Sequence, residues 1–352
     1  MFDRSKLTAY PLNERKNLVD ITTAVVDPSD TAFVTEAKLA DRVEKIASDI
    51  LQARKNGSAV MLAFGAHAIK NGLGRLLGEM ASRGWFTHLA TNGAGIIHDW
   101  EFAYQGESSE DVRANVAEGK FGTWDETGLY LNLALAVGAF EGLGYGESVG
   151  KMIVNKGLTI PSSSELTKSA AGLDLLELLE TLKIAPGFLS IEHPYASYSV
   201  QGRCYSENIP CTSHPMFGHD IIYTHKAMRG AAIGRTAERD FLRYVSSVAD
   251  LAGGVYLSVG SAVMSPMIFE KSLSMARNIG IPVDHGAIHV VDLAPEGWDW
   301  STGEPPMDNP AYYLRYMKTF SRMGLETSYL SSDNRDFFVA LYRALEKQSE
   351  ES

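Results

Sequence analysis

The most informative stretch of the chain reads Ser58-Ala-Val-Met-Leu-Ala-Phe64, followed by Gly65-Ala-His67. A short apolar run of this kind is typical of a strand that is buried on both faces of a parallel sheet. The segment 68–83 has a helical pattern, and a second short strand, 86–91, precedes the turn Asn92-Gly-Ala-Gly95. Strands that alternate with helices in this way predict a parallel sheet with helices on both faces.

The same alternation extends toward both ends of the chain. Upstream, the segment 34–54 carries apolar residues on one helical face. Downstream, apolar strands over 254–259, 287–292 and 326–331 alternate with helical segments over 264–278, 309–323 and 333–347. We therefore predict a doubly wound, mostly parallel α/β fold. It comprises an N-terminal extension, 1–33, and a single α/β domain, 34–348, with a helical insert over about 105–185.

Composition narrows the range of functions. The 352 residues include 32 basic and 43 acidic side chains, for a net charge of −11, which argues against nucleic acid or an anionic membrane as the main partner. Only two cysteines are present, Cys204 and Cys211, and the first residues are too polar for a signal peptide. We expect a soluble, cytoplasmic protein without a disulfide framework.

Ligands of open parallel sheets bind beyond the carboxyl ends of the strands, so the turns that follow the strands are the candidate sites. Small residues there allow backbone N–H groups to approach a phosphate. Several of the predicted turns are rich in glycine, which suggests a dinucleotide, but none matches the G-x-G-x-x-G fingerprint. Tight turns also use glycine for backbone reasons alone, so both interpretations stay open.

Two groups of ionisable residues lie near these turns. His98, Asp99 and Glu101 follow the second turn, where they could transfer protons or could simply complement the helix dipole. His214 and the pair His219-Asp220 follow another predicted strand. The histidines lack the close spacing of zinc ligands, and we predict no metal site.

Lys318 lies in the aromatic segment Pro310-Ala-Tyr-Tyr-Leu-Arg-Tyr-Met-Lys318. A lysine among aromatic rings can lose its proton through desolvation and become a nucleophile that forms an imine. The alternative is a surface lysine whose stem covers apolar side chains. Without further evidence the sequence favours the surface lysine.

The order of the turns resembles that of deoxyhypusine synthase and its relatives, from about Ser58 to Leu345. The resemblance is carried by the turns at 64–72 and 89–99, by Glu207-Asn-Ile-Pro210 with Gly218-His-Asp220, by 257–263, and by the spacing of Lys318 and Tyr329. The family's Trp-Gly-Lys is Tyr316-Met-Lys318 here. Its triple glycine is Gly260-Ser-Ala, and its acidic amine clamp keeps one acid in Trp298-Asp299-Trp300.

The resemblance implies a Rossmann-like domain, a homotetramer, and an NAD-dependent enzyme that dehydrogenates a polyamine or related amine. The alkylamine fragment would then pass through an imine on Lys318 to a protein lysine or a second amine. By resemblance, the residues that contact NAD are Gly65, His67, Asn92, Gly93, Ala94, Gly260 and Ser261. His98, Asp99 and Asp220 would join Lys318 in catalysis, and the residues near the amine would be His214, His219, Asp299 and Tyr316.

Two other interpretations stay open. A different enzyme on the same fold would use His67, Lys70, His98, His214 and Asp220 on a phosphate or acyl substrate, and Lys318 would be dispensable. A noncatalytic nucleotide-binding protein would keep the turns without turnover. Retained cofactor binding in the absence of amine turnover would favour the noncatalytic protein.

Overall fold

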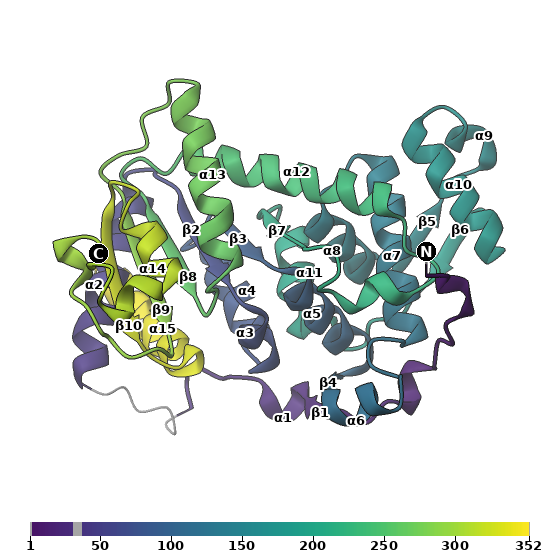
Figure 1. The fold of residues 1–352 in the computed structure, drawn as a ribbon, viewed down its shortest axis with the longest axis horizontal. Helices are drawn as coiled ribbons and strands as arrows, with labels where there is room; N and C mark the ends of the chain where they lie inside the picture. Colours follow the sequence, from purple (N-terminus) through teal and green to yellow (C-terminus); the bar gives the residue numbers. More distant parts are fainter. Residues whose placement is uncertain (1, 31–36, 352) are drawn as a thin grey trace. The chain divides into compact units, whose positions relative to one another are not determined.

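The computed structural model describes residues 2–30 and 37–351 (Figure 1). Its contacts divide the chain into two compact units. The first comprises Met1–Ala24 and Asn92–Phe241, and the second comprises Val25–Thr91 and Leu242–Ser352. Residues 34–36 of the first expected helix, and 31–33 of the expected extension, lie outside the described residues. The domain bounds expected from the sequence stay a prediction.

The second unit is built on a parallel sheet of short, buried strands. Its strands are β2 (Val60–Phe64), β3 (His88–Thr91), β8 (Val255–Val259), β9 (Ala287–Asp292) and β10 (Glu326–Ser331). They lie in the order β10-β9-β8-β2-β3, and Leu62 of β2 stands opposite Leu89 of β3 and Leu257 of β8. All five residues of β2 are buried, which explains its uninterrupted apolar sequence.

Helices cover both faces of this sheet. On one face, α13 (Met264–Asn278) and α14 (Arg315–Phe320) pack through Phe269 and Phe320 against Tyr256. On the other, α2 (Ala37–Lys55) and α15 (Asn334–Glu350) pack together and contact β2, β8 and β9. Successive residues of a strand point to opposite faces, so both sets of helices bury apolar side chains. The expected doubly wound, mostly parallel α/β fold is confirmed.

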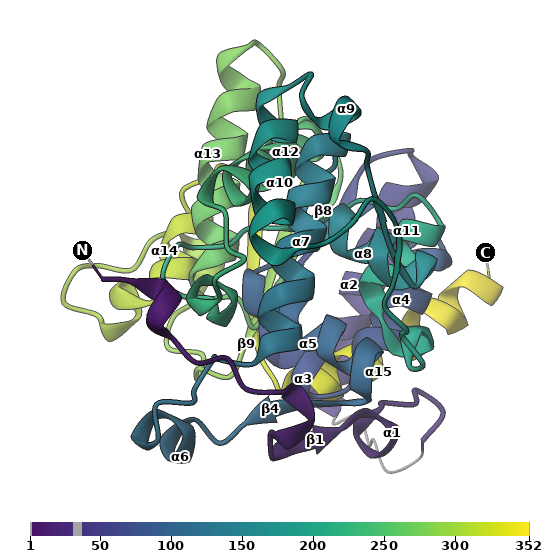
Figure 2. The same cartoon turned by 90° about the vertical axis from the view of Figure 1, so that its right-hand side faces the viewer.

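The first unit is mainly helical. Its longer helices are α5 (Gly93–Gln105), α7 (Asp125–Glu141), α8 (Tyr145–Asn155), α10 (Ala170–Leu182) and α11 (Val200–Ser206). α7 contacts α5, α8 and α10 (Figure 2) and is buried along most of its length. Two short antiparallel pairs join β1 (Asn17–Asp20) to β4 (Glu107–Glu110) and β5 (Gly157–Ile160) to β6 (Gly187–Ser190).

The remaining elements are short, apart from one long helix. In the first unit they are α1 (Ile21–Ala24), α6 (Val112–Ala117), α9 (Ser163–Leu166) and β7 (Cys211–Ser213). In the second they are α3 (Ala66–Lys70) and α4 (Gly74–Ser82). The boundary between the units falls within α12 (Gly230–Ala249).

Several expected helices are shorter than the sequence pattern suggested. The segment 68–83 forms two helices, α3 and α4, because Gly72 adopts φ +80° between them. The segment 309–323 keeps only the six residues of α14 as α-helix. Among the described residues, no helix is long and apolar enough to cross a membrane. Cys204 and Cys211 are both buried and free.

Candidate functional site

The carboxyl ends of β2 and β8 form a topological switch point. Numbered in chain order within the second unit, the five strands lie in the order 2-1-3-4-5, so the chain leaves β2 toward one side and later returns on the other. The connections that leave such a point run in opposite directions, and ligands of doubly wound sheets bind in the crevice there. The sheet order therefore selects the turns after β2 and β8.

Those two turns touch through their backbones. A Cβ atom on Gly65 would overlap the carbonyl oxygen of Gly260, so there is no room for a side chain between the two turns at this point. Gly260 itself adopts φ +58°, a left-handed conformation that favours glycine. The next residue, Ser261, is buried, and its Oγ accepts a hydrogen bond from the backbone N–H of Ser265 in the first turn of α13 (3.3 Å). His67 lies exposed in the first turn of α3.

A cavity of about 410 Å³ lies in the same unit, beside the segment that follows β9. It combines aromatic rings with two carboxylates and one guanidinium. The lining side chains are Arg42, Glu296, Trp298, Asp299, Trp300, Ser301, Thr327, Ser328 and Tyr329. Glu296 pairs with Arg42 (3.2 Å). Asp299, which the sequence analysis placed near the amine, accepts hydrogen bonds from the backbone and hydroxyl of Ser301 (3.1 and 2.6 Å).

Two other predicted residues lie near this cavity or on α14. Tyr316 is buried behind the cavity wall, with its ring 6.3 Å from that of Tyr329. Lys318 does not line the cavity among the described residues; its Nζ lies 3.2 Å from the centre of the Tyr312 ring. An aromatic face attracts the ammonium form of a lysine. Lys318 therefore lies over the face of the Tyr312 ring.

The turn Asn92-Gly-Ala in the first unit opens α5. Asn92 caps this helix by accepting a hydrogen bond from Gly95 N–H (2.9 Å). The Asp220 carboxyl lies directly over Gly93, where a Cβ would overlap it. Burial raises the pKa of Asp220 to about 6, although the Tyr223 hydroxyl donates a hydrogen bond to it (3.0 Å) and works in the other direction. A negative group thus occupies the start of α5, where the helix dipole favours one.

Asp99 is fully buried and fixes the beginning of α11. Its carboxylate accepts hydrogen bonds from the Ser199 hydroxyl (2.6 Å), Val200 N–H (3.0 Å) and Gln201 N–H (3.2 Å). Burial raises the pKa of Asp99, and these donors oppose the rise. The hydrogen bonds of the Asp99 carboxylate therefore go to the beginning of α11.

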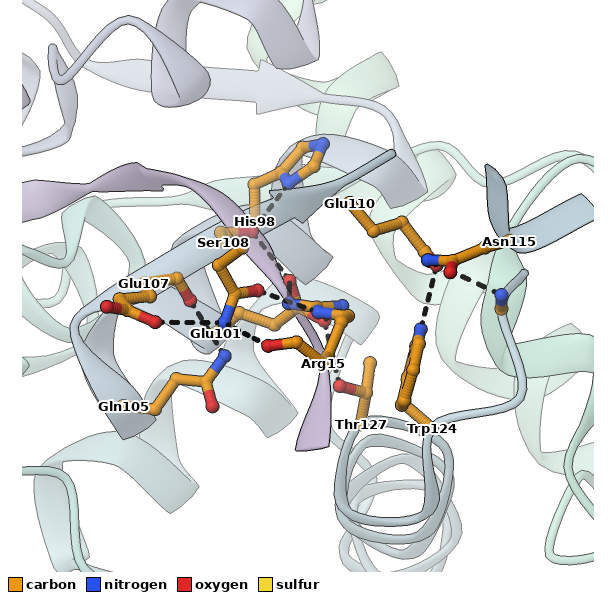
Figure 3. Close-up of polar contacts among 12 residues, drawn as sticks. Arg15, His98, Glu101, Gln105, Glu107, Ser108, Glu110, Asn115, Trp124 and Thr127 are labelled. Carbon is orange, nitrogen blue, oxygen red and sulfur yellow. Dashed lines mark hydrogen bonds and ion pairs between the residues drawn. The ribbon is translucent and has the colours of Figure 1, made fainter. Parts of the chain in front are cut away.

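His98 belongs to a buried polar network, drawn in Figure 3. Its Nδ1 lies 2.8 Å from the Ser108 hydroxyl, which donates to Glu101 (2.6 Å). Glu101 also receives two hydrogen bonds from Arg15 (2.8 and 2.7 Å) and one from Thr127 (2.8 Å). Although burial acts to raise the pKa of Glu101, the charge and hydrogen bonds of Arg15 bring it below the ordinary value.

The two histidines expected near the amine differ in exposure. His214 is buried, its Nε2 lies 3.0 Å from the Thr212 hydroxyl, and burial lowers its pKa to about 3. It is therefore neutral at physiological pH. His219 is exposed, with Nδ1 3.4 Å from the carbonyl of Phe217.

The predicted residues thus fall into two sets. The second unit contains Gly65, His67, Gly260, Ser261, Asp299, Tyr316 and Lys318. The first unit contains Asn92, Gly93, Ala94, His98, Asp99, His214, His219 and Asp220. Sequence reasoning named Glu101 only as a helix-dipole or proton-transfer residue and missed Arg15 and Ser108. No spacing in the chain relates Arg15 to Glu101, 86 positions later. Within residues 2–30 and 37–351, no group of three or more His, Cys, Asp or Glu side chains could hold a metal ion.

Comparisons with known proteins add little beyond the fold. No protein-family model matches the chain, and no curated protein sequence does. Among solved structures, AgrE in its complex with ornithine and NAD+ is similar at 15% identity with a TM-score of 0.48. The similarity covers 91% of this chain but 34% of AgrE, so the chain spans about a third of that protein's length.

Two further structures are similar over most of their own length. A proposed LOR/SDH protein from Methanococcus maripaludis S2 matches at 14% identity with a TM-score of 0.48, covering 92% of this chain and 74% of that one. A proposed deoxyhypusine synthase from Entamoeba histolytica matches at 8% identity with a TM-score of 0.38, covering 82% and 76%. The deoxyhypusine synthase match has lower identity and a lower TM-score than the other two.

Proposed function

We propose that this chain is an NAD-dependent enzyme that dehydrogenates an amine. The observation that carries the proposal is the switch point between β2 and β8, where the turns of Gly65 and Gly260 meet through their backbones. A dinucleotide needs such a place, because its pyrophosphate must approach backbone N–H groups closely. When bound, NAD supplies the hydride acceptor.

The residues at this edge fit the group they would hold. The turn of Ser261 leads into α13, a helix of 15 residues that begins at Met264, so this end of the helix offers N–H donors and a partial positive charge to a phosphate. Asp292 ends the neighbouring strand β9, and Gly260 N–H donates to the carbonyl of Val291 just before it (2.9 Å). A carboxylate there can accept hydrogen bonds from a ribose hydroxyl.

The cavity beside Asp299 would take the amine. Aromatic faces and carboxylate oxygens are the groups that attract an organic ammonium, and Trp298, Tyr329 and Asp299 supply both kinds. The net charge of −11 favours the approach of a cation. Two of the similar structures are AgrE complexes with ornithine and with L-arginine, and this chain's own substrate is proposed only at the level of an amine.

Beyond dehydrogenation, we retain the transfer through Lys318 as part of the proposal. Lys318 would lose its ammonium proton and leave the Tyr312 ring. Its neutral nitrogen would then add to the carbon of the imine product, and the original amine would depart with a proton as the new C=N bond forms. Oxidation is complete before this step, so the transfer needs no further oxidant. The recipient would be a protein lysine or a second amine, and the assembly would be a homotetramer.

The cofactor site is tested by a matched pair of substitutions at Ser261. Asparagine and aspartate can both keep the acceptor that Ser265 N–H requires, but only aspartate adds a negative charge. At about 5 Å and an effective dielectric of about 20, repulsion from one phosphate charge is roughly 3 kcal/mol. Calorimetric titration with NAD should show Ser261→Asn within about threefold of wild type and Ser261→Asp weakened at least tenfold.

Two outcomes would remove the proposal. Wild-type protein that binds no NAD would leave only the fold. Equal affinity of the two variants would place the cofactor elsewhere. With binding established, the appearance of NADH on addition of diamines and amino acids identifies the amine.

A further inference from the structure

We propose that a cavity at the start of α7 is a binding site for a small zwitterion with an apolar body, such as an α-amino acid with an uncharged side chain. The cavity has a volume of about 340 Å³, and all the residues that line it belong to the first unit. Pockets for small molecules begin at roughly 300 Å³, so a ligand of this size fits. The charged groups that line the cavity are two cations, Arg4 and Lys226, and two carboxylates, Asp125 and Glu126.

Hydrogen bonds hold the N-terminal segment against the first turn of α7 and so shape the cavity. Tyr10 N–H donates to the carbonyl of Thr123, and Asp125 N–H donates to the carbonyl of Tyr10, both at 2.8 Å. Leu12 N–H donates to the Glu126 carboxylate (2.6 Å). These bonds lie within the chain itself, so the cavity exists before any ligand arrives.

A buried histidine determines what the Asp125 carboxylate meets. Nδ1 of His225 accepts a hydrogen bond from Ala227 N–H (3.1 Å), so the proton of the neutral ring is on Nε2, 3.0 Å from Asp125 Oδ1. Burial lowers the pKa of His225, and the hydrogen bond to Asp125 opposes this change. The positive charges of Lys226 and Arg4 add to the lowering. The ring is therefore neutral at physiological pH, and Asp125 accepts its hydrogen bond without gaining a counter-charge.

The opposite charges of this cavity do not pair with one another. Within residues 2–30 and 37–351, the side chains of Arg4 and Lys226 form no hydrogen bond or ion pair, although both carboxylates line the same cavity. A lone anion would be repelled by Asp125 and Glu126, and a lone cation would be repelled by the two basic side chains. A zwitterion can place its carboxylate with the cations and its ammonium group with the acids.

The apolar part of the lining selects the body of the ligand. Leu7, Ala9 and Pro11 also line the cavity. An aliphatic side chain would bury apolar surface against them. The cations and acids of the site already balance, so a third charge on the ligand would be taken out of water without a partner. We therefore expect free leucine to bind better than free lysine or glutamate.

Calorimetric titration of the full chain with leucine tests the site, together with two analogues that each lack one charge. Leucine amide has no carboxylate, and isocaproic acid has no ammonium group. Each analogue should bind at least about tenfold more weakly than leucine, because it leaves charged side chains of one sign without a partner. Lysine and glutamate should be weakened to a similar extent. Wild-type protein that binds no leucine, or that binds either analogue as tightly, overturns the proposal.

Arg4 and Lys6 provide a matched pair, because both lie on the short 3-10 helix Arg4–Lys6 and only Arg4 lines the cavity. Arg4→Gln and Lys6→Gln each remove one positive charge. Arg4→Gln should weaken leucine binding at least about tenfold, and Lys6→Gln should stay within about twofold of wild type. Asp125→Asn, which keeps an acceptor for His225, should be weakened as Arg4→Gln is. Equal affinity of the Arg4 and Lys6 variants overturns the site.

The cavity beside Asp299 in the second unit supplies the last control. Asp299→Asn should leave leucine affinity within about twofold of wild type, because no residue of the second unit lines the cavity at α7. Loss of leucine binding in Asp299→Asn, with normal binding in Arg4→Gln, would assign leucine to the second unit and overturn the proposal. The site does not depend on the proposed function, which the Ser261 variants test separately.

Discussion

Replacing Asp220 by asparagine should stabilise the folded chain at neutral pH, with an effect that fades in acid. Burial raises the pKa of this carboxyl from 3.8 to about 6 in the folded state. Between these values the folded chain binds more protons than the unfolded chain, so the free energy of unfolding falls as the pH rises. Above pH 6 the folded protein carries the full cost of an ionised, buried Asp220.

The size of the effect follows from the same shift. Each pKa unit corresponds to 1.36 kcal/mol, so a rise of about two units corresponds to about 3 kcal/mol. The asparagine side chain of the variant has no charge to bury, and its amide oxygen can still accept the hydroxyl of Tyr223. The variant should therefore exceed wild type by about 3 kcal/mol at pH 7.5, and by almost nothing below pH 4.

Urea denaturation at pH 4, 5, 6 and 7.5 measures the difference. Asp308→Asn, at an exposed position, serves as a control whose effect should be small and flat with pH. Tyr223→Phe removes the donor that lowers the pKa of Asp220, so the loss of stability should begin at the same pH as in wild type and continue to a higher pH. A difference between Asp220→Asn and wild type that does not vary with pH, or an Asp220→Asn protein that is less stable at pH 7.5, would refute the reasoning. A protein that becomes more stable when a carboxylate is removed has kept that carboxylate at a cost in stability, which is the pattern expected where function requires the charge.

Three further substitutions test other parts of the structure. Glu101→Gln should cost about 3–5 kcal/mol in urea denaturation, because it leaves the Arg15 guanidinium buried without its counter-charge; a loss below about 1 kcal/mol would contradict the ion-pair argument. Gly65→Ala should cost at least about 2 kcal/mol, since its Cβ overlaps the Gly260 carbonyl, whereas Gly234→Ala, with open space in α12, should be neutral or stabilising by up to about 1 kcal/mol. Lys318→Ala should abolish alkylamine transfer while NAD affinity measured by calorimetry stays within about twofold; full transfer activity would remove the imine role.

The strands of the second unit could be read from the sequence because each is a short apolar run between turn residues. The expected ranges 287–292 and 326–331 coincide with β9 and β10. The pairs β1–β4 and β5–β6 were not predicted. Their strands have four residues each, and β1 meets a partner about 90 positions away, which no local pattern reveals.

The candidate site was predictable in its turns and not in its contacts. The turns after β2 and β8 stand out in the sequence as Gly65 and Gly260, and strand order explains why they meet. Acidic residues that are close in the sequence have different structural partners. Asp99 and Glu101 differ by two positions on α5, yet one caps α11 and the other joins Arg15. Side chains two apart on a helix point in different directions, so their partners come from distant segments.

The cap that Asp99 provides has a consequence for the order in which the first unit folds. α11 has seven residues, too few for a helix to persist alone in water, and the acceptor at its start comes from a residue 101 positions earlier. Ser199 caps the Gly202 N–H within the helix itself, but the N–H groups of Val200 and Gln201 find their acceptor only once α5 is in place. During synthesis on the ribosome, α5 is made well before α11, so the Asp99 carboxylate is already present when α11 forms.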